Sequence, residues 1–72
     1  MEKEIKYYRK LGAKLVQARL EMKKEQTEVA LHIGKTQSYI SKIENGDIKV
    51  DLYTLTLIAS YYKKPMSFFI GE

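Results

Sequence analysis

Side chains with hydrogen-bonding or charged groups follow one another closely in the middle of the chain. From Gln37 to Lys42 the sequence reads QSYISK, which supplies an amide, two hydroxyls, a phenol and an ammonium group. Such groups can bond to the edges of nucleobases and to phosphate oxygens. Ile40 and Ile43 form one apolar stripe if this stretch is helical. A helix here would therefore bury the isoleucines and present the polar groups to a partner.

The residues just before this stretch supply a tight turn and a second short helix. Ala30, Gly34, Ile40 and Ile43 follow the pattern A-x3-G-x5-I-x2-I, which suits two short helices packed across a sharp turn. Ala30 is small enough for close helix packing, and Gly34 can take the positive φ that ends a helix. Thr36 can cap the helix that follows.

Residues 26–46 resemble the helix-turn-helix of the phage repressor and Cro-like (xenobiotic-response-element type) DNA-binding domains. That family has Gln at the start of one helix, then Ala, Gly and a closing I-x-x-I-E-x-G. The matching residues here are Gln26, Ala30, Gly34, Ile40, Ile43, Glu44 and Gly46. The A-x3-G-x5-I spacing alone occurs in many helical hairpins, but the continuation I-E-N-G makes the signal strong. The likeness runs from about Leu11 to Ile70, and it implies a compact all-α repressor-like domain of five helices.

The resemblance also implies roles for particular side chains. Helices expected over 26–33 and 37–45 would form the helix-turn-helix, with the second helix in the major groove. Base contacts are then expected from Gln37, Ser38, Tyr39 and Lys42, with Tyr39 at a base methyl or a phosphate. Phosphate contacts are expected from Gln26, Lys35, Asn45 and Lys49. Gln26 as a solvated helix former is the plain alternative.

In the family, an Arg near the end of the first helix pairs with the Glu of I-E-x-G. The resemblance therefore implies a structural ion pair between Arg19 and Glu44, against the alternative of two independent surface charges. Glu25 stands where the family has a Ser or Thr cap, so it is not expected to act as a standard N-cap. The lone histidine, His32, is expected to be exposed and without a catalytic role.

The residues before Gln26 predict one amphipathic helix over about Glu4 to Lys24. Gly12 inside it costs about 1 kcal/mol relative to alanine. In the family a Gly often opens the first helix, so residues 1–10 are expected to be an N-terminal extension, either an added turn or a flexible arm. The apolar positions recur every three or four residues: Tyr8, Leu11, Leu15, Ala18 and Met22. The basic side chains have two interpretations, phosphate contacts or a solvated face: Lys3, Lys6, Arg9, Lys10 and Lys14.

After Gly46 the sequence predicts two further helices. Val50 stands where the family has a Pro, which leaves the rigidity of the loop open. Asp51 can cap a fourth helix, and Pro65 suits the first turn of a short fifth one. The resemblance places the core stripe of the fourth helix at Leu52, Leu55, Ile58, Ala59 and Tyr62. The end of the chain is apolar enough to close the core and to meet a second subunit: Met66, Phe68, Phe69 and Ile70.

Composition limits the classes of function. Seventy-two residues without cysteine and with one histidine predict a single domain over 1–72, without disulfides, catalytic residues, metal ligands or a cofactor. No apolar run reaches the roughly 20 residues that span a bilayer, so no membrane partner and a cytoplasmic location are expected. The net charge of +4 favours a polyanion but does not require one.

These observations predict a sequence-specific, repressor-like transcriptional regulator that binds a two-fold symmetric site on double-stranded DNA. A homodimer is expected, formed through Tyr61, Phe68, Phe69 and Ile70. The alternative is a protein-interaction module on the same fold, such as an antitoxin or co-regulator that binds a regulatory protein partner and little or no DNA. An enzyme fits least, because no nucleophile and base can be assembled from these residues.

Overall fold

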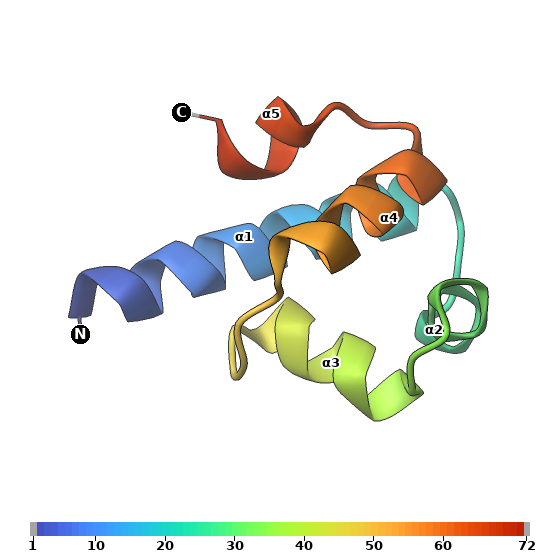
Figure 1. The fold of residues 1–72 in the computed structure, drawn as a ribbon, viewed down its shortest axis with the longest axis horizontal. Helices are drawn as coiled ribbons and strands as arrows, with labels where there is room; N and C mark the ends of the chain where they lie inside the picture. The colour runs from blue at the N-terminus through green and yellow to red at the C-terminus, as the bar shows by residue number, and fades with distance from the viewer. Residues whose placement is uncertain (1, 72) are drawn as a thin grey trace.

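Five α-helices in succession make up the computed structural model, which describes residues 2–71 (Figure 1). They are α1 (Glu2–Glu21), α2 (Gln26–Ile33), α3 (Gln37–Asn45), α4 (Leu52–Tyr62) and α5 (Met66–Ile70). Within the described residues the fold is all-helical, which confirms the predicted fold class. In Figure 1, α2 and α3 lie below α1 and α4, and α5 lies above α1. No described helix combines the length and the apolar character needed to cross a membrane.

The core is filled by one apolar stripe from each helix. On α1 the spacing of three and four residues places Leu11, Leu15 and Ala18 inward, and all three are buried. Ile40 and Ile43 are the corresponding residues on α3. The remaining buried apolar residues come from α2, the α3–α4 loop, α4 and α5: Val29, Ala30, Val50, Leu55, Ile58, Ala59, Tyr62 and Phe69.

At Gly12 the backbones of α1 and α3 approach each other closely. A Cβ atom built on Gly12 would clash with the carbonyl oxygen of Glu44 and lie 2.9 Å from that of Ile43. The sequence indicated only the helix-propensity cost of this glycine. In the structure, the helix-propensity cost of Gly12 is offset by packing. Because residue 12 has no side chain, the C-terminal end of α3 lies directly against α1.

Residues 2–10 form the first turns of α1, so this part of the chain is helical as its periodicity predicted, and the flexible-arm alternative is wrong for these residues. This half of α1 lies beside the α3–α4 loop. Lys49 Nζ on that loop is 2.9 Å from the carboxylate of Glu4, and a Cβ added at Gly46 would come within 3.0 Å of the Arg9 backbone. At its other end α1 stops at Glu21, short of the expected Lys24, because Lys23 adopts a left-handed φ of 56°.

The turn between α2 and α3 is built as its residue types indicate. Gly34 takes a left-handed conformation with φ of 73°, where its N–H closes α2. Thr36 caps α3, since its hydroxyl oxygen accepts a hydrogen bond of 3.1 Å from the N–H of Tyr39. At the start of α2, Glu25 is the N-cap residue but makes no standard side-chain cap bond, as expected. Its own N–H donates to the Glu28 carboxylate at 2.9 Å, so Glu28 satisfies the first N–H at this helix end.

The α3–α4 loop is anchored by its apolar residues, with Val50 buried and Ile48 half-buried. Asp51 caps α4 as predicted, accepting from the Thr54 N–H at 3.0 Å and from its hydroxyl at 2.6 Å. The expectation that Leu52 belongs to the core is wrong, because its side chain is 68% exposed. Thr54 takes the inward position in this first turn, where the aspartate satisfies its hydroxyl.

The end of the chain folds back over α1. Pro65 immediately precedes α5 rather than lying in its first turn. Phe69 is buried in the core, at 5% exposure, so its expected place on a dimer surface is wrong. Phe68 and Tyr61 are half-buried, and Ile70 is 43% exposed.

Candidate nucleic-acid interface

Helix α3 separates its buried and exposed residues onto opposite faces. Ile40, Ile43 and Glu44 are buried against the rest of the molecule. The opposite face carries side chains that are exposed: Gln37, Ser38, Lys42 and Asn45. Their groups are an amide, a hydroxyl, an ammonium and a second amide, which provide both hydrogen-bond donors and acceptors.

Beneath that face, Glu44 is held by an arginine from α1. Arg19 Nε lies 2.7 Å from one carboxylate oxygen of Glu44, and Arg19 Nη2 lies 3.1 Å from the other. A third guanidinium nitrogen, Nη1, donates to the carbonyl of Lys24 at 3.0 Å. The side chain of Glu44 is 3% exposed and that of Arg19 is 14% exposed. The hydrogen bond to Glu44 raises the pKa of Arg19 above its ordinary value, with burial opposing the shift.

Gln26, the first residue of α2, links this ion pair to the exposed face. Its Nε2 donates to Glu44 at 2.8 Å, and its Oε1 accepts a hydrogen bond from Gln37 Nε2. A carboxylate can only accept, so the NH2 group of Gln26 must point to Glu44 and its oxygen must point to Gln37. The buried pair therefore sets the orientation of Gln26, and Gln26 in turn positions Gln37.

Lys35 and Lys49, two expected phosphate ligands, lie on either side of α3 in the chain and both are exposed. Lys35 Nζ lies 5.1 Å from the centre of the Tyr39 ring. Lys49 is engaged with Glu4, whose hydrogen bond raises the pKa of the lysine above its ordinary value. Lys35 thus has its charge available at the surface, whereas a phosphate would have to compete with Glu4 for Lys49.

Tyr39 differs from its neighbours on α3 because its ring is half-buried against the core. This burial raises the pKa of its phenol above the ordinary value. The ring lies at the edge of the polar face rather than in its centre, beside Lys35.

A family model for the helix-turn-helix of the Cro/C1 type, the xenobiotic-response-element family, matches residues 15–69. The chain belongs to this helix-turn-helix family. It is a family of DNA-binding regulatory domains, and the resemblance drawn from residues 26–46 is confirmed. A search of curated proteins finds no match. The match begins at Leu15, so residues 2–14 of α1 lie outside it.

The polar face of α3 is thus the outer face of a DNA-binding helix-turn-helix. Two contacts of the expected site residues were missed from the sequence, namely that of Gln26 with Gln37 and that of Lys49 with Glu4. The sequence contains a signal for the Gln26–Gln37 contact, because these two glutamines are the first residues of two consecutive helices of the helix-turn-helix. The second carries no signal, because nothing in the spacing of residues 4 and 49 places α1 beside the α3–α4 loop.

Proposed function

We propose that the chain is a sequence-specific transcriptional regulator of the repressor type. In this proposal two copies bind a two-fold symmetric operator on double-stranded DNA, each with α3 in the major groove. Gln37, Ser38 and Lys42 contact base edges, with Tyr39 at the rim of the contact. Gln26, Lys35, Asn45 and Lys49 lie at phosphates. The observation that carries the proposal is the hydrogen-bonded series from Arg19 to Gln37 on the exposed face of a helix-turn-helix.

Gln37 is the central base contact in this proposal. One N–H of its amide is used by Gln26, which leaves the second N–H and the carbonyl oxygen for a ligand. The free N–H can donate to N7 of adenine while the carbonyl oxygen accepts from its N6 amino group. This pair of bonds contributes about 1 to 3 kcal/mol of discrimination against another base. Because the amide is already oriented, little conformational entropy is lost when it binds.

Gln26 has a narrower role than the sequence suggested. Its side-chain amide is bonded on both sides, to Glu44 and to Gln37. The phosphate contact is therefore proposed to use the backbone N–H groups at the start of α2, where the helix dipole also favours an anion.

Two copies are proposed because one recognition helix reads too few base pairs. A genome offers roughly 10⁶ to 10⁹ competing non-specific sites, and a second α3 on an inverted half-site doubles the number of bases read. The polar composition of the α3 face favours DNA over a protein partner, since the exposed residues there include no apolar side chain.

Binding of variants to operator and random duplexes tests the proposal. Gln37→Ala should weaken operator binding by about 1 to 3 kcal/mol and leave binding to random DNA nearly unchanged. Lys35→Ala should weaken both duplexes alike, because a phosphate contact carries no sequence information. Gln17→Ala, which removes an exposed glutamine bonded to Glu21 on α1, is the matched control and should change neither. Equal losses on both duplexes for Gln37→Ala would remove its role in reading bases.

A further inference from the structure

Most of the net positive charge of the chain lies in the N-terminal segment of α1, residues 2–14. This segment carries five basic and two acidic side chains, so it contributes +3 to a chain whose net charge is +4. The family match covers residues 15–69 and leaves the segment out. A polyanion is therefore attracted to a part of the molecule that does not belong to the helix-turn-helix itself.

The N-terminal segment of α1 is held against the loop that follows α3. Lys49 on this loop pairs with Glu4 at 2.9 Å. Tyr8 of the segment and Ile48 of the loop are both half-buried against the core. In Figure 1 the segment extends past the C-terminal end of α3. Packing and the ion pair therefore fix the position of the segment relative to the recognition helix.

Arg9 lies beside the C-terminal end of α3. A Cβ built on Gly46 would lie 3.0 Å from the Cα of Arg9 and 3.1 Å from its Cγ, so the arginine side chain begins next to the residue that ends α3. Arg9 is exposed, and the four ion pairs among the described residues do not include it. Its charge is therefore available to a ligand at this end of the helix.

Asn45, the last residue of α3, needs a cation nearby if it is to hold a phosphate as proposed above. Its exposed amide carries no charge, and the C-terminal end of a helix disfavours anions because the helix dipole is negative there. Asp47 adds a negative charge two residues further along. Lys42 is assigned to a base edge, and Lys49 is already paired with Glu4. The cation must therefore come from another element.

We infer that the N-terminal segment of α1 is a second DNA-contacting element, in which Arg9 and Asn45 together hold one phosphate. The inference rests on the DNA binding proposed above and adds to it a residue outside the family match. Arginine suits this position because its guanidinium can donate two parallel hydrogen bonds to a phosphate. The Asn45 amide can donate a further one. Each copy then holds the DNA backbone through α1 as well as through the helix-turn-helix.

Lys10 and Lys14 lie on the other side of α1 and do not join this site. Gly12 faces α3, and residues two positions away along a helix point in nearly the opposite direction. Both lysines line a hollow of about 330 Å³ between α1 and α5, and Lys14 Nζ lies 5.0 Å from the centre of the Phe68 ring. Lys10 is therefore a neighbour of Arg9 in sequence that carries the same charge on the side of α1 away from α3.

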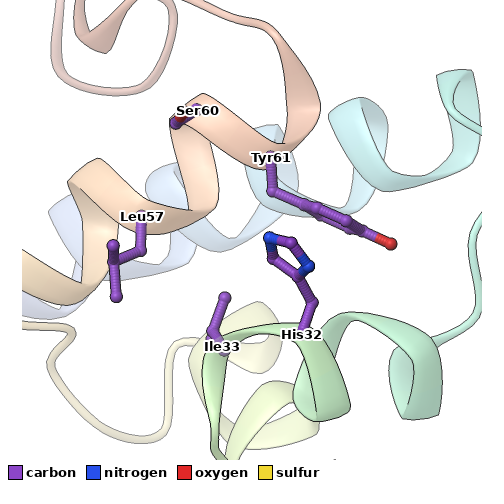
Figure 2. A pocket seen from close by; sticks show the side chains of 5 residues that line it. All are labelled: His32, Ile33, Leu57, Ser60 and Tyr61. Carbon is purple, nitrogen blue, oxygen red and sulfur yellow. The ribbon is translucent and has the colours of Figure 1, made fainter.

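The hollow between α2 and α4 is a poor alternative site for a phosphate (Figure 2). It has a volume of about 340 Å³, and its lining contains neither lysine nor arginine: His32, Ile33, Leu57, Ser60 and Tyr61. Figure 2 shows the ring of His32 lying against Tyr61, and the two ring centres are 4.1 Å apart. An aromatic and aliphatic lining of this kind does not compete with Arg9 for the DNA backbone.

The salt dependence of DNA binding by the full chain tests the inference. Arg9→Ala should make the slope of log affinity against log salt shallower by about one per copy, so by about two for the two-copy complex. Arg9→Lys keeps the charge and should keep the slope. Lys10→Ala, the matched control, removes the same charge from the other side of α1 and should leave the slope nearly unchanged. Equal changes for Arg9→Ala and Lys10→Ala would overturn the inference, because net charge alone would then explain them.

A cycle of single and double variants tests whether Arg9 and Asn45 hold the same phosphate. Arg9→Ala and Asn45→Ala should each weaken binding to operator and random duplexes alike, and the double variant should lose clearly less than the product of the two losses. Losses that multiply would place the two residues at separate phosphates and overturn the shared site. Thermal unfolding of Arg9→Ala should match that of the natural chain, since the side chain is exposed.

The same measurements separate this inference from the proposed function. If the natural chain binds its operator and Arg9→Ala binds it with the same affinity and salt slope, α1 is not a DNA contact although the proposed function stands. A natural chain that binds neither operator nor random duplexes would contradict both.

Discussion

The guanidinium of Arg19 on α1 meets both carboxylate oxygens of Glu44 on α3, at 2.7 Å and 3.1 Å, across 25 residues of sequence. Bidentate contact of this kind is specific to arginine. It fixes the C-terminal half of α3 against α1, and through Gln26 it also fixes the exposed amide of Gln37. A structural ion pair thus supports the surface proposed to read DNA.

Arg19→Ala should destabilise the fold by about 3 to 5 kcal/mol, because it leaves the buried carboxylate of Glu44 without its partner. That is a large part of the roughly 4 to 11 kcal/mol available to a chain of this size. Glu44→Ala should cost a similar amount, and the double variant should cost much less than the two losses added together. Urea unfolding of the four proteins measures this coupling. Small and additive losses would show that the pair contributes little.

Gly12→Ala should destabilise the chain, although alanine is the better helix former. A Cβ at this position clashes with the Glu44 carbonyl, and overpacking typically costs about 1 to 3 kcal/mol, against a gain in helix propensity of about 1 kcal/mol. Gly34→Ala is the comparison variant for steric overlap. A Cβ at residue 34 would meet no atom within 4 Å, so only the left-handed φ of 73° should destabilise that variant. A more stable Gly12→Ala variant in thermal unfolding would contradict the close approach of α1 and α3.

Lys63→Gly should stabilise the chain by about 1 kcal/mol, because Lys63 ends α4 in a left-handed conformation with φ of 59° that costs a residue with a Cβ roughly 1 to 2 kcal/mol. For a domain of this size, that is a rise in Tm of about 4 to 8 °C. Lys63→Ala removes the same charge but keeps the Cβ, so its Tm should change little. Thermal unfolding at low protein concentration keeps self-association out of the comparison. Equal Tm values for the two variants would argue against strain at this position.

Affinity for DNA should fall steeply with salt. A dimer with 6 to 10 phosphate contacts loses on the order of 10³ to 10⁵ in affinity between about 50 and 200 mM salt. A salt-independent affinity would instead favour the protein-interaction alternative.

Glu4→Gln should make that salt dependence steeper. The substitution releases Lys49 from its 2.9 Å ion pair, and the freed lysines should add about one per copy, so about two for the two-copy complex, to the slope of log affinity against log salt. Glu2→Gln is the matched control, because it changes the net charge equally but removes a partner of Lys6 at 3.9 Å. The same slope for both variants would show that Lys49 does not lie at a phosphate.

The sequence predicted the helix-turn-helix well because its determinants are local. A capping Thr36, a glycine at the end of α2 and two isoleucines three residues apart each constrain only the nearest turns of the chain. The resemblance then supplied the partner of Arg19, which residue spacing alone does not indicate.

The errors concern packing between distant segments. Helical periodicity shows which residues of one helix face inward, but not which segment lies opposite, so the approach of Gly12 to α3 and of Glu4 to Lys49 was missed. Leu52 and Phe69 are similarly apolar, yet the first is exposed and the second is buried. The difference depends on where α4 begins and how α5 folds back over α1.

Selection of bound sequences from a random pool of duplexes measures whether two copies read a symmetric DNA site through α3. We expect an enriched inverted repeat with half-site centres about 10 to 10.5 base pairs apart, or a multiple of that spacing. Selection with Gln37→Ala should relax the preference at one position in each half-site. Enrichment of a single asymmetric site saturated by one copy, or no enrichment at all, would contradict the reading of DNA by two copies.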